Sequence, residues 1–383
     1  MSNKIKLLFI LRMLGFGGAE RQVVELCQGL DKNRFDITVA LFFDDGEGYL
    51  EDLKKTSVVV KILADKKSYK FNVLSRLIKL MRQEQFNIVH TFLPIPNLIG
   101  GLAARLAKQK IVVGSIRNAN PFSWTDIFCL MDRVALNLFC DNVIANSQTG
   151  AQMTIEKYGV KPVKVFVIRN GKNFVQYTSL HSAGKLKENL NIPSDCKVIT
   201  TIGRITRQKG HRYLIEAADI LVHRQKLKLH FLVVGKAEES YSEMESLIRK
   251  FNLESCVHRL GVRRDIGDLL NISDVFVLPS LWEGLANVLL EAMACGVPVV
   301  ASDISSNREV VEHDKTGLLF PPQNAAALAA AIERVVSDPL GMRPMAQRGR
   351  ETILTKFDLT RLVKQHQDFY QSLLQNEKIR TSG

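Results

Sequence analysis

Short apolar strands alternate with helical segments along almost the whole chain, and this alternation constrains the fold more than any other feature. The strands are rich in Val, Ile and Leu, as expected when helices cover both faces of a sheet. Strands of this kind that are separated by helices form parallel sheets, so we predict an α/β protein. The predicted strands are residues 4–11, 35–43, 57–63, 87–92, 111–116, 142–145, 163–168, 197–202, 228–234, 256–260, 275–278, 297–300 and 317–320.

The length of the chain and the helices between the strands predict two domains. A chain of 383 residues suits two domains of ordinary size. The stretch 171–193 is polar, lacks clear periodicity and is predicted to link them. Two such domains leave a cleft between two sets of strand ends, which is a common ligand site. The predicted helices are residues 18–29, 71–85, 97–108, 124–139, 147–158, 209–223, 240–252, 264–272, 285–294, 324–337 and 341–376.

Composition points to a cytoplasmic protein. Apolar residues make up 46% of the chain, yet no apolar run reaches the ~18 residues needed to span a bilayer. Residues 4–11 suit a buried first strand better than the core of a signal peptide. The six cysteines form no Cys-x-x-Cys pair and have no histidines nearby, which favours free thiols in a reducing compartment over a structural zinc.

The net charge of +13 is concentrated in residues 1–175, which contain 25 Lys/Arg and 15 Asp/Glu. A basic half can attract nucleic acid, anionic lipid headgroups or phosphorylated substrates; the alternative is a basic surface that only confers solubility. In this half, the segment 66–85 has two interpretations. It could be a helix that lies on an anionic membrane surface, or a helix whose apolar side faces the core and whose basic side faces solvent. Its cations are Lys66, Lys67, Lys70, Arg76, Lys79 and Arg82, and its apolar stripe is Phe71, Leu74, Leu77, Ile78 and Met81.

Two carboxylates lie close to the turn between strand 275–278 and the helix that follows it, one in the loop and one on the helix. Glu283 lies in the loop and Glu291 lies eight residues later on the helix, at most roughly 12 Å further along its axis. A helix start attracts phosphate, and open α/β sheets bind ligands outside the carboxyl ends of their strands. The spacing suits a ligand lying along the helix start; the alternative is that both carboxylates are ordinary loop and surface groups.

Cations follow the first strand of the second half. Arg204 and Lys209 lie five residues apart across the loop after strand 197–202. Two cations beside a helix start make a plausible diphosphate clamp, because Arg binds bidentately and Lys acts as a mobile point charge. A chance pairing on the surface is the alternative.

In the first half, glycines and polar residues also follow strands. Gly17 and Gly18 precede a helix, where backbone can approach an anion or simply form a tight turn. His90 ends a strand and is therefore predicted at the rim of the cleft. Arg117 and Asn118 end the next strand and would offer a cation and an amide to the cleft.

With these motifs, the chain resembles the retaining glycosyltransferases of family 4, whose GT-B fold has two Rossmann-like domains facing each other across a cleft. The most specific match is 279–320, where Glu283 and Glu291 belong to Glu-Gly-x-x-Asn-Val-Leu-Leu-Glu-Ala-Met-Ala. The other matching segments are Gly203-Arg204 with Lys209-Gly210, Gly17-Gly18-Ala19-Glu20 and Val89-His90. The resemblance implies an acceptor-side domain at 1–175, a nucleotide-sugar-binding domain at 190–357, and a helix at about 358–376 that packs back on the first.

The resemblance also implies roles for individual residues. Arg204 and Lys209 would hold the donor diphosphate, Glu291 the ribose hydroxyls, and Glu283 would face the donor sugar or its phosphate. The implied donor-binding set is Gly17, Gly18, Arg204, Lys209, Glu283, Gly284, Leu285, Ala286, Asn287, Val288 and Glu291. The implied catalytic residues are His90, Arg204, Lys209 and Glu283, and the acceptor side is Glu20, His90, Arg117 and Asn118. Many members have a histidine where this chain has Ile116-Arg117-Asn118.

The implied activity is transfer of a hexose or N-acetylhexosamine, with retention, from a nucleotide-diphosphate sugar to a lipid-linked or polysaccharide acceptor. Such enzymes act in polysaccharide, capsule or lipopolysaccharide synthesis, and we expect this one at the inner face of the cell membrane, with anionic lipid as a further partner. Cations and helix-start amides would stabilise the leaving phosphate, so no metal is expected.

Three other functions stay open. An epimerase or a phosphorylase could use the same fold, and would be recognised by turnover without an acceptor or by a need for inorganic phosphate. A nucleic-acid-binding protein could use the basic half. We expect no nucleic-acid partner, because the sequence contains no recognised nucleic-acid motif.

Overall fold

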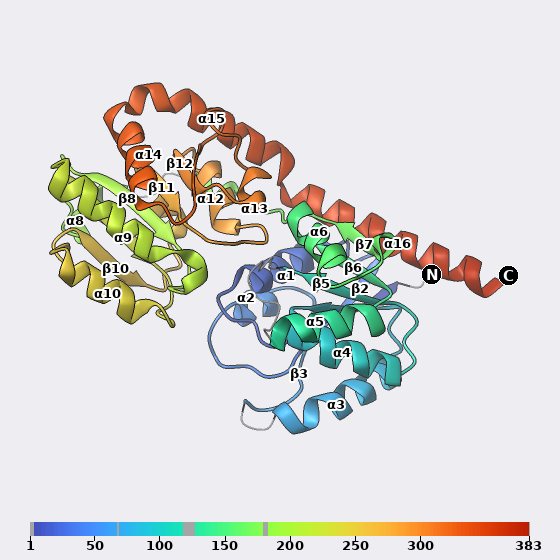
Figure 1. The fold of residues 1–383 in the computed structure, drawn as a ribbon. Helices are drawn as coiled ribbons and strands as arrows, with labels where there is room; N and C mark the ends of the chain where they lie inside the picture. The colour runs from blue at the N-terminus through green and yellow to red at the C-terminus, as the bar shows by residue number, and fades with distance from the viewer. Residues whose placement is uncertain (1–3, 67–68, 118–126, 179–182, 383) are drawn as a thin grey trace. The chain divides into compact units, whose positions relative to one another are not determined.

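The computed structural model describes residues 4–66, 69–117, 127–178 and 183–382, and the chain divides into two compact units. Unit 1 comprises Met1–Lys172 and Asp358–Gly383, and unit 2 comprises Asn173–Phe357 (Figure 1). Each unit contains one parallel sheet with helices on both faces, which confirms the predicted α/β class.

The sheet of unit 1 has seven strands in the order β3-β2-β1-β4-β5-β6-β7. Alternate residues of β1 enter opposite cores: Leu7 and Phe9 face one side, and Leu8 and Ile10 face the other. Each fully buried side chain of this kind contributes about 1.5–3 kcal/mol. The strands are β1 (Ile5–Leu11), β2 (Phe35–Leu41), β3 (Val59–Ile62), β4 (Ile88–Phe92), β5 (Val112–Ile116), β6 (Asn142–Ala145) and β7 (Val165–Val167).

The helices of unit 1 divide between the two faces of this sheet (Figure 1). α1 and α16 supply apolar side chains to one core, and α3, α4, α5 and α6 supply the other. The helices are α1 (Gly18–Gly29), α2 (Leu50–Lys54), α3 (Tyr69–Glu84), α4 (Pro94–Leu106), α5 (Ile127–Leu138), α6 (Gln148–Glu156), the 3₁₀ turn η1 (Pro162–Lys164) and α16 (Leu359–Ser382).

The apolar stripe of α3 faces the core. Leu77 and Met81 are fully buried, and Leu74 and Ile78 pack against the same cluster. For these four residues the structure confirms the alternative of a core-facing helix.

The sheet of unit 2 has six parallel strands in the order β10-β9-β8-β11-β12-β13. Its core lies in two layers, one on each face, because successive residues of a strand point to opposite sides. The strands are β8 (Lys197–Ile202), β9 (Leu229–Val234), β10 (Val257–Gly261), β11 (Val275–Leu278), β12 (Val299–Ser302) and β13 (Leu318–Phe320).

The helices of unit 2 lie on both faces of its sheet. Leu214 of α9 and Leu289 of α12 belong to different core clusters, so these two helices cover opposite faces. The helices are α7 (Val175–Thr178), α8 (Ala183–Asn189), the 3₁₀ turn η2 (Arg207–Lys209), α9 (His211–Asp219), the π-helical η3 (Ile220–Arg224), α10 (Tyr241–Lys250), α11 (Ile266–Asn271), α12 (Asn287–Ala294), α13 (Ser305–Arg308), α14 (Ala325–Ser337) and α15 (Pro339–Lys356).

Two segments differ from the sequence prediction. The predicted linker belongs to unit 2 from Asn173 onward, because Phe174, Tyr177 and Ile192 bury their side chains in its core. The predicted helix 341–376 is two helices, α15 and α16, which belong to different units.

The chain leaves unit 1 after Lys172 and re-enters it at Asp358. At this point Leu359 N donates to Lys172 O at 3.0 Å. Within the described parts of the chain, no helix has the length and apolar character needed to cross a bilayer.

Candidate functional site

The strand order of unit 2 places its candidate site at the carboxyl ends of β8 and β11. These strands are neighbours, and the helices that follow them, α9 and α12, cover opposite faces of the sheet. The loops after two such strands diverge, and open α/β sheets bind ligands in the resulting crevice. The predicted Lys209 and Glu283 lie in these two loops.

Backbone contacts fix the two loops against each other. Gly210 has a φ of +64°, and a Cβ there would collide with the carbonyl oxygen of Pro279. Only glycine has the conformational freedom and the small size that this position needs. Leu281 N also donates to Gln208 O at 2.7 Å, so Lys209 is held beside the loop that carries Glu283.

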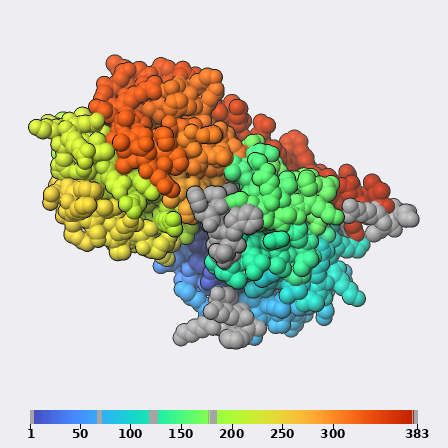
Figure 2. Space-filling view, viewed as in Figure 1, coloured from blue at the N-terminus to red at the C-terminus, as the bar shows by residue number. Residues whose placement is uncertain are grey.

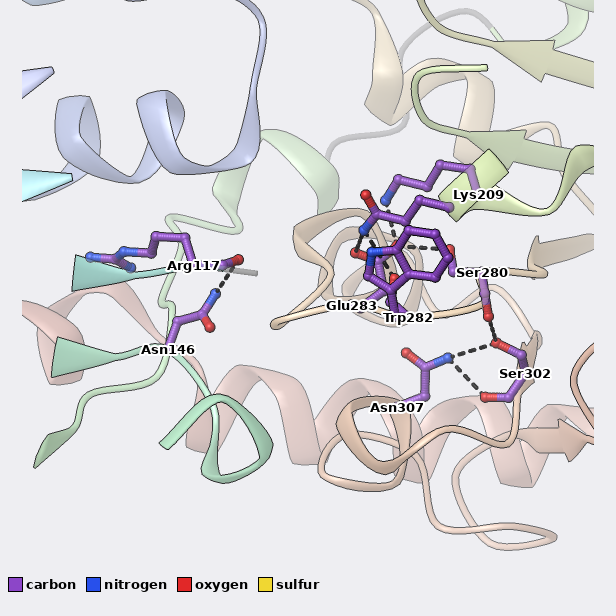
Figure 3. A network of polar contacts seen from close by, with 9 residues as sticks. Arg117, Asn146, Lys209, Ser280, Trp282, Glu283, Ser302 and Asn307 are labelled. Atoms are coloured by element: carbon purple, nitrogen blue, oxygen red, sulfur yellow. Dashed lines mark hydrogen bonds and ion pairs between the residues drawn. The ribbon is translucent and has the colours of Figure 1, made fainter. Parts of the chain in front are cut away.

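The Glu283 carboxylate is the centre of the site (Figure 3). Its Oε1 lies 2.5 Å from Lys209 Nζ and accepts a hydrogen bond from Ser280 Oγ at 2.7 Å. Its Oε2 accepts from Gln208 Nε2 at 3.3 Å, and the same amide also donates to Trp282 O at 2.9 Å. Because the carboxylate is buried, these partners fix both its position and its orientation.

A second layer of buried polar groups supports Ser280. Ser302 Oγ, at the end of β12, donates to Ser280 O, and Asn307 Nδ2 of α13 donates to Ser302 O at 2.8 Å (Figure 3). Sequence reasoning missed Gln208, Ser280, Ser302 and Asn307. The available signal was that Ser280 lies two residues after β11 and Ser302 is the last residue of β12, and both strands lead toward the predicted site.

We expect Ser280→Ala to lower kcat about tenfold, because the buried carboxylate loses one of its hydrogen bonds and its fixed orientation. The measurement is steady-state donor turnover together with the thermal unfolding temperature. Ser246→Ala is the matched control, since Ser246 Oγ donates to Ser242 O on the exposed side of α10. Equal kcat for both variants and the wild type would remove Ser280 from the site.

Arg204 lies at the start of the same loop as Lys209 but pairs with another carboxylate. Its Nη1 lies 3.1 Å from Glu238 Oε2, in the loop after β9, and half of its side chain is exposed. Each predicted phosphate-binding cation is therefore neutralised by a carboxylate of unit 2 in this structure.

The first turn of α12 carries the other predicted donor-binding residues. The helix begins at Asn287, directly after the buried Leu285 and Ala286, and Gly284 joins it to Glu283. Glu291 is buried on α12, and burial, together with the charge of Glu291, raises the pKa of Cys295 to about 12. Glu291 therefore lies on the inner side of the helix, not on its solvated face.

In unit 1, the predicted glycine turn forms the start of α1. Gly17 is the N-cap with an ordinary φ of −127°, but a Cβ there would collide with the Glu20 carboxylate. Glycine leaves room for the flexible Glu20 side chain here, although neither the backbone conformation nor a rigid contact requires glycine at this position. The carboxylate of Glu20 lies over the helix start, where its charge is favourable.

The prediction that His90 lies at an open rim is wrong. His90 stands in the middle of β4 on the side that α16 covers, and it is fully buried. Its ring nitrogens lie 2.7 Å from Tyr370 Oη and 2.7 Å from Ser115 Oγ. Burial, and then the positive charge of neighbouring groups, holds the pKa of His90 well below its usual value. We therefore assign His90 a structural role.

Arg117, which was predicted to offer a cation to the cleft, holds its guanidinium against side chains of unit 1. Its guanidinium packs 5.4 Å from the centre of the Phe92 ring, and its Nη1 donates to Asn170 Oδ1 at 2.9 Å. Its Nε and Nη2 are also buried, and burial lowers its pKa to about 10. The Arg117 carbonyl oxygen accepts from Asn146 Nδ2 at 3.4 Å (Figure 3). Asn118 lies outside the described residues.

Comparison with known proteins identifies the family. The family model for glycosyltransferase family 4 matches residues 16–173, and the model for glycosyl transferases group 1 matches residues 183–352. The chain belongs to the family 4 glycosyltransferases, and it is an enzyme with the GT-B fold.

Two curated relatives and one solved structure show how far this similarity extends. The chain is 28% identical to the Escherichia coli UDP-Gal:α-D-GlcNAc-diphosphoundecaprenol α-1,3-galactosyltransferase, over 98% of this chain and 99% of the relative. It is 28% identical to the Bacillus anthracis N-acetyl-α-D-glucosaminyl L-malate synthase, over 81% of each. The crystal structure of Anabaena HepE with UDP and glucose has a similar fold, with a TM-score of 0.87 and 23% identity over 96% of this chain and all of that one.

Proposed function

We propose that this enzyme transfers a hexose or N-acetylhexosamine from a UDP-sugar to a sugar on a polyprenyl-diphosphate carrier, at the cytoplasmic face of the membrane. Similarity over nearly the full length to a galactosyltransferase named for a UDP-galactose donor and a diphosphoundecaprenol-linked acceptor supports this proposal. The observation that carries it is the ion pair between Lys209 and the buried Glu283 at the carboxyl ends of β8 and β11.

The residues of unit 2 suit departure of a nucleotide diphosphate. When the bond between the sugar C1 and the phosphate oxygen breaks, its electron pair leaves with the phosphate, and positive charge develops on the sugar ring. Lys209 and Arg204 would stabilise the leaving phosphate, and the first turn of α12 would assist. Glu283, whose carboxylate is oriented by hydrogen bonds from Ser280 and Gln208, would face the sugar.

We propose retention of configuration through attack on the face that the phosphate leaves. The acceptor hydroxyl would form the new bond to C1 and pass its proton to the departing phosphate oxygen. Unit 2 would bind the donor and unit 1 the acceptor. Two protein cations would supply the countercharge, so we propose that the reaction needs no metal.

The proposal is tested by incubating the full chain with UDP-galactose, UDP-glucose or UDP-N-acetylglucosamine and a GlcNAc-diphosphoprenol acceptor, with and without EDTA. We expect one donor to give a disaccharide-lipid with the α linkage in both conditions. Conversion of the UDP-sugar without an acceptor would instead indicate an epimerase, and dependence on inorganic phosphate a phosphorylase. A product of β configuration would overturn retention.

Glu291→Gln is expected to weaken UDP binding about 10- to 100-fold, because the ribose hydroxyls would lose a charged hydrogen-bond acceptor. Isothermal titration with UDP measures this change. Glu351→Gln is a matched control, because Glu351 is an exposed glutamate of α15. If the two variants bind UDP alike, Glu291 does not contact the ribose.

A further inference from the structure

Unit 2 has a cavity of about 350 Å³ beside the start of α9. It lies on the α9 side of the sheet, because Met244 of α10, which lines it, belongs to the same core layer as α9. α9 and α10 pack side by side and form part of the yellow-green to yellow surface in Figure 2. The volume falls within the range of roughly 300–1,000 Å³ that is typical of small-molecule sites. None of the predicted donor-binding residues that the structure describes lines this cavity, so it is separate from the donor site.

Two buried polar side chains of this cavity have no hydrogen-bond partner within the part of the chain that the structure describes. His211 is 2% exposed, and both of its ring nitrogens lack a partner. Thr206 is 6% exposed, and its Oγ1 also lacks one. Both residues line the cavity. Buried polar atoms without partners are rare and costly, so two of them at one cavity indicate that a bound molecule completes their hydrogen bonds.

The start of α9 brings backbone donors to the same cavity. Gly210, which lines the cavity, is the N-cap of this helix, and it has no side chain that could accept from the first N–H groups. The first N–H groups of a helix have no partner within the helix itself. The cavity therefore combines backbone donors with the free polar atoms of His211 and Thr206.

The hydrogen-bonding groups of the cavity match a ligand that both donates and accepts. His211 is neutral, because burial, and then the charge of Lys209, lowers its pKa to about 3. A neutral imidazole has one N–H donor and one acceptor nitrogen, and the hydroxyl of Thr206 can also do both. The hydroxyl groups of a sugar have the same double capacity. Tyr213 also lines the cavity, and its aromatic ring offers an apolar surface for the C–H groups of a sugar.

The charges around the cavity disfavour an anion as its ligand. The guanidinium of Arg212 donates to Glu243 Oε1 at 2.9 Å and to Glu216 Oε1 at 3.0 Å, so its charge is already matched. Arg207, the other cation of the lining, is exposed, and its backbone N–H donates to Glu239 Oε1 at 3.1 Å. Carboxylates therefore accompany both cations, and a neutral polyhydroxyl ligand fits this balance better than a phosphate does.

We propose that this cavity is a second saccharide site of unit 2, in which His211 and Thr206 bind the hydroxyl groups of one sugar ring. The sugar is either a free monosaccharide or the end of a glycan chain, since both present the same groups. This site goes beyond the proposed function, because it binds a sugar that is not the one being transferred. It also stands without that function, because the proposal depends only on the residues of the cavity.

The test is a titration of the full chain with the methyl glycosides of glucose, galactose, mannose and N-acetylglucosamine, followed by ligand-observed NMR in the presence of saturating UDP. We expect at least one glycoside to bind with a Kd in the millimolar range. Thr206→Val and His211→Phe should each weaken this binding at least about tenfold, because each removes polar atoms that face the sugar. Glu283→Gln should bind the glycoside like the wild type, because Glu283 belongs to the donor site.

Two matched variants control for the loss of a hydroxyl and of an imidazole elsewhere in unit 2. Thr355→Val changes an exposed threonine of α15, whose Oγ1 donates to Glu351 O, and His223→Phe changes an exposed histidine of η3. Both should bind the glycoside like the wild type. The thermal unfolding temperature shows whether each variant is folded, and Thr206→Val keeps the test decisive if His211→Phe does not fold, because valine has nearly the shape of threonine.

Three results would overturn the proposal. The first is no binding of any of the four glycosides at about 50 mM. The second is binding that Glu283→Gln weakens and the cavity variants do not, which would place the sugar in the donor site. The third is binding of inorganic phosphate, lost in Thr206→Val, without binding of any glycoside. If a glycoside does bind, a disaccharide that binds more tightly identifies the end of a glycan chain as the ligand, and equal or weaker binding identifies a free sugar.

Discussion

Lys209→Ala is expected to lower kcat/KM by about 30- to 1,000-fold, which corresponds to a loss of about 2–4 kcal/mol of transition-state stabilisation. The substitution removes the cation that lies 2.5 Å from Glu283 and that we place beside the leaving diphosphate. It also leaves a buried carboxylate without its countercharge, so the unfolding temperature should fall as well. Steady-state kinetics and thermal unfolding measure the two effects.

A double variant separates catalysis from stability. Lys209→Ala with Glu283→Gln should recover most of the lost unfolding temperature, because the carboxylate is no longer charged, but it should not recover activity. Lys197→Ala is the matched control, since Lys197 pairs with Asp274 at 3.0 Å at the other end of β8. Activity near the wild-type level in Lys209→Ala would contradict the phosphate-binding role.

The contribution of Asp132 to the stability of the protein is expected to fall as pH rises from about 4 to about 7, and Asp132→Asn should remove this contribution. Burial raises the pKa of Asp132 to about 7, partly offset by a hydrogen bond from Asn97. The folded protein then holds a proton that the unfolded chain releases near pH 4. The stabilisation from this proton is complete below that pH and is lost as pH rises to about 7. The loss amounts to at most about 4 kcal/mol.

Thermal unfolding followed by circular dichroism at pH 5 and pH 8 measures this effect. The difference in unfolding temperature between Asp132→Asn and the wild type should be larger at pH 8, in favour of the variant. Asp368→Asn is the control, because Asp368 lies on the exposed side of α16 and pairs with Lys364. A difference that does not depend on pH would show that Asp132 does not titrate in this range.

The sequence predicted the fold class and the two loops of the candidate site for physical reasons. Strand 275–278 is a continuous apolar run and strand 197–202 is rich in β-branched residues, and Gly203 and Pro279 directly after them mark where the loops begin. Charged residues such as Lys209 and Glu283 rarely lie in a buried place without a partner, and here each is the partner of the other.

Other features could not be predicted, because they depend on contacts between distant segments. Successive residues of a strand point to opposite faces, and the sequence does not show which face of the sheet His90 is on. Its partner Tyr370 is 280 residues away in the sequence. Arg117 follows a strand as predicted, yet its long side chain turns back over Phe92.

The position of α16 has a consequence for synthesis on the ribosome. Tyr370 and Phe369 complete the core on one face of the unit 1 sheet, but they are translated after all of unit 2. The nascent chain must therefore carry a sheet face that α1 covers only in part while the middle of the protein is made and folded. Such a surface is prone to aggregation. A frameshift or stop codon near residue 358 would leave unit 2 complete, but unit 1 would lack α16.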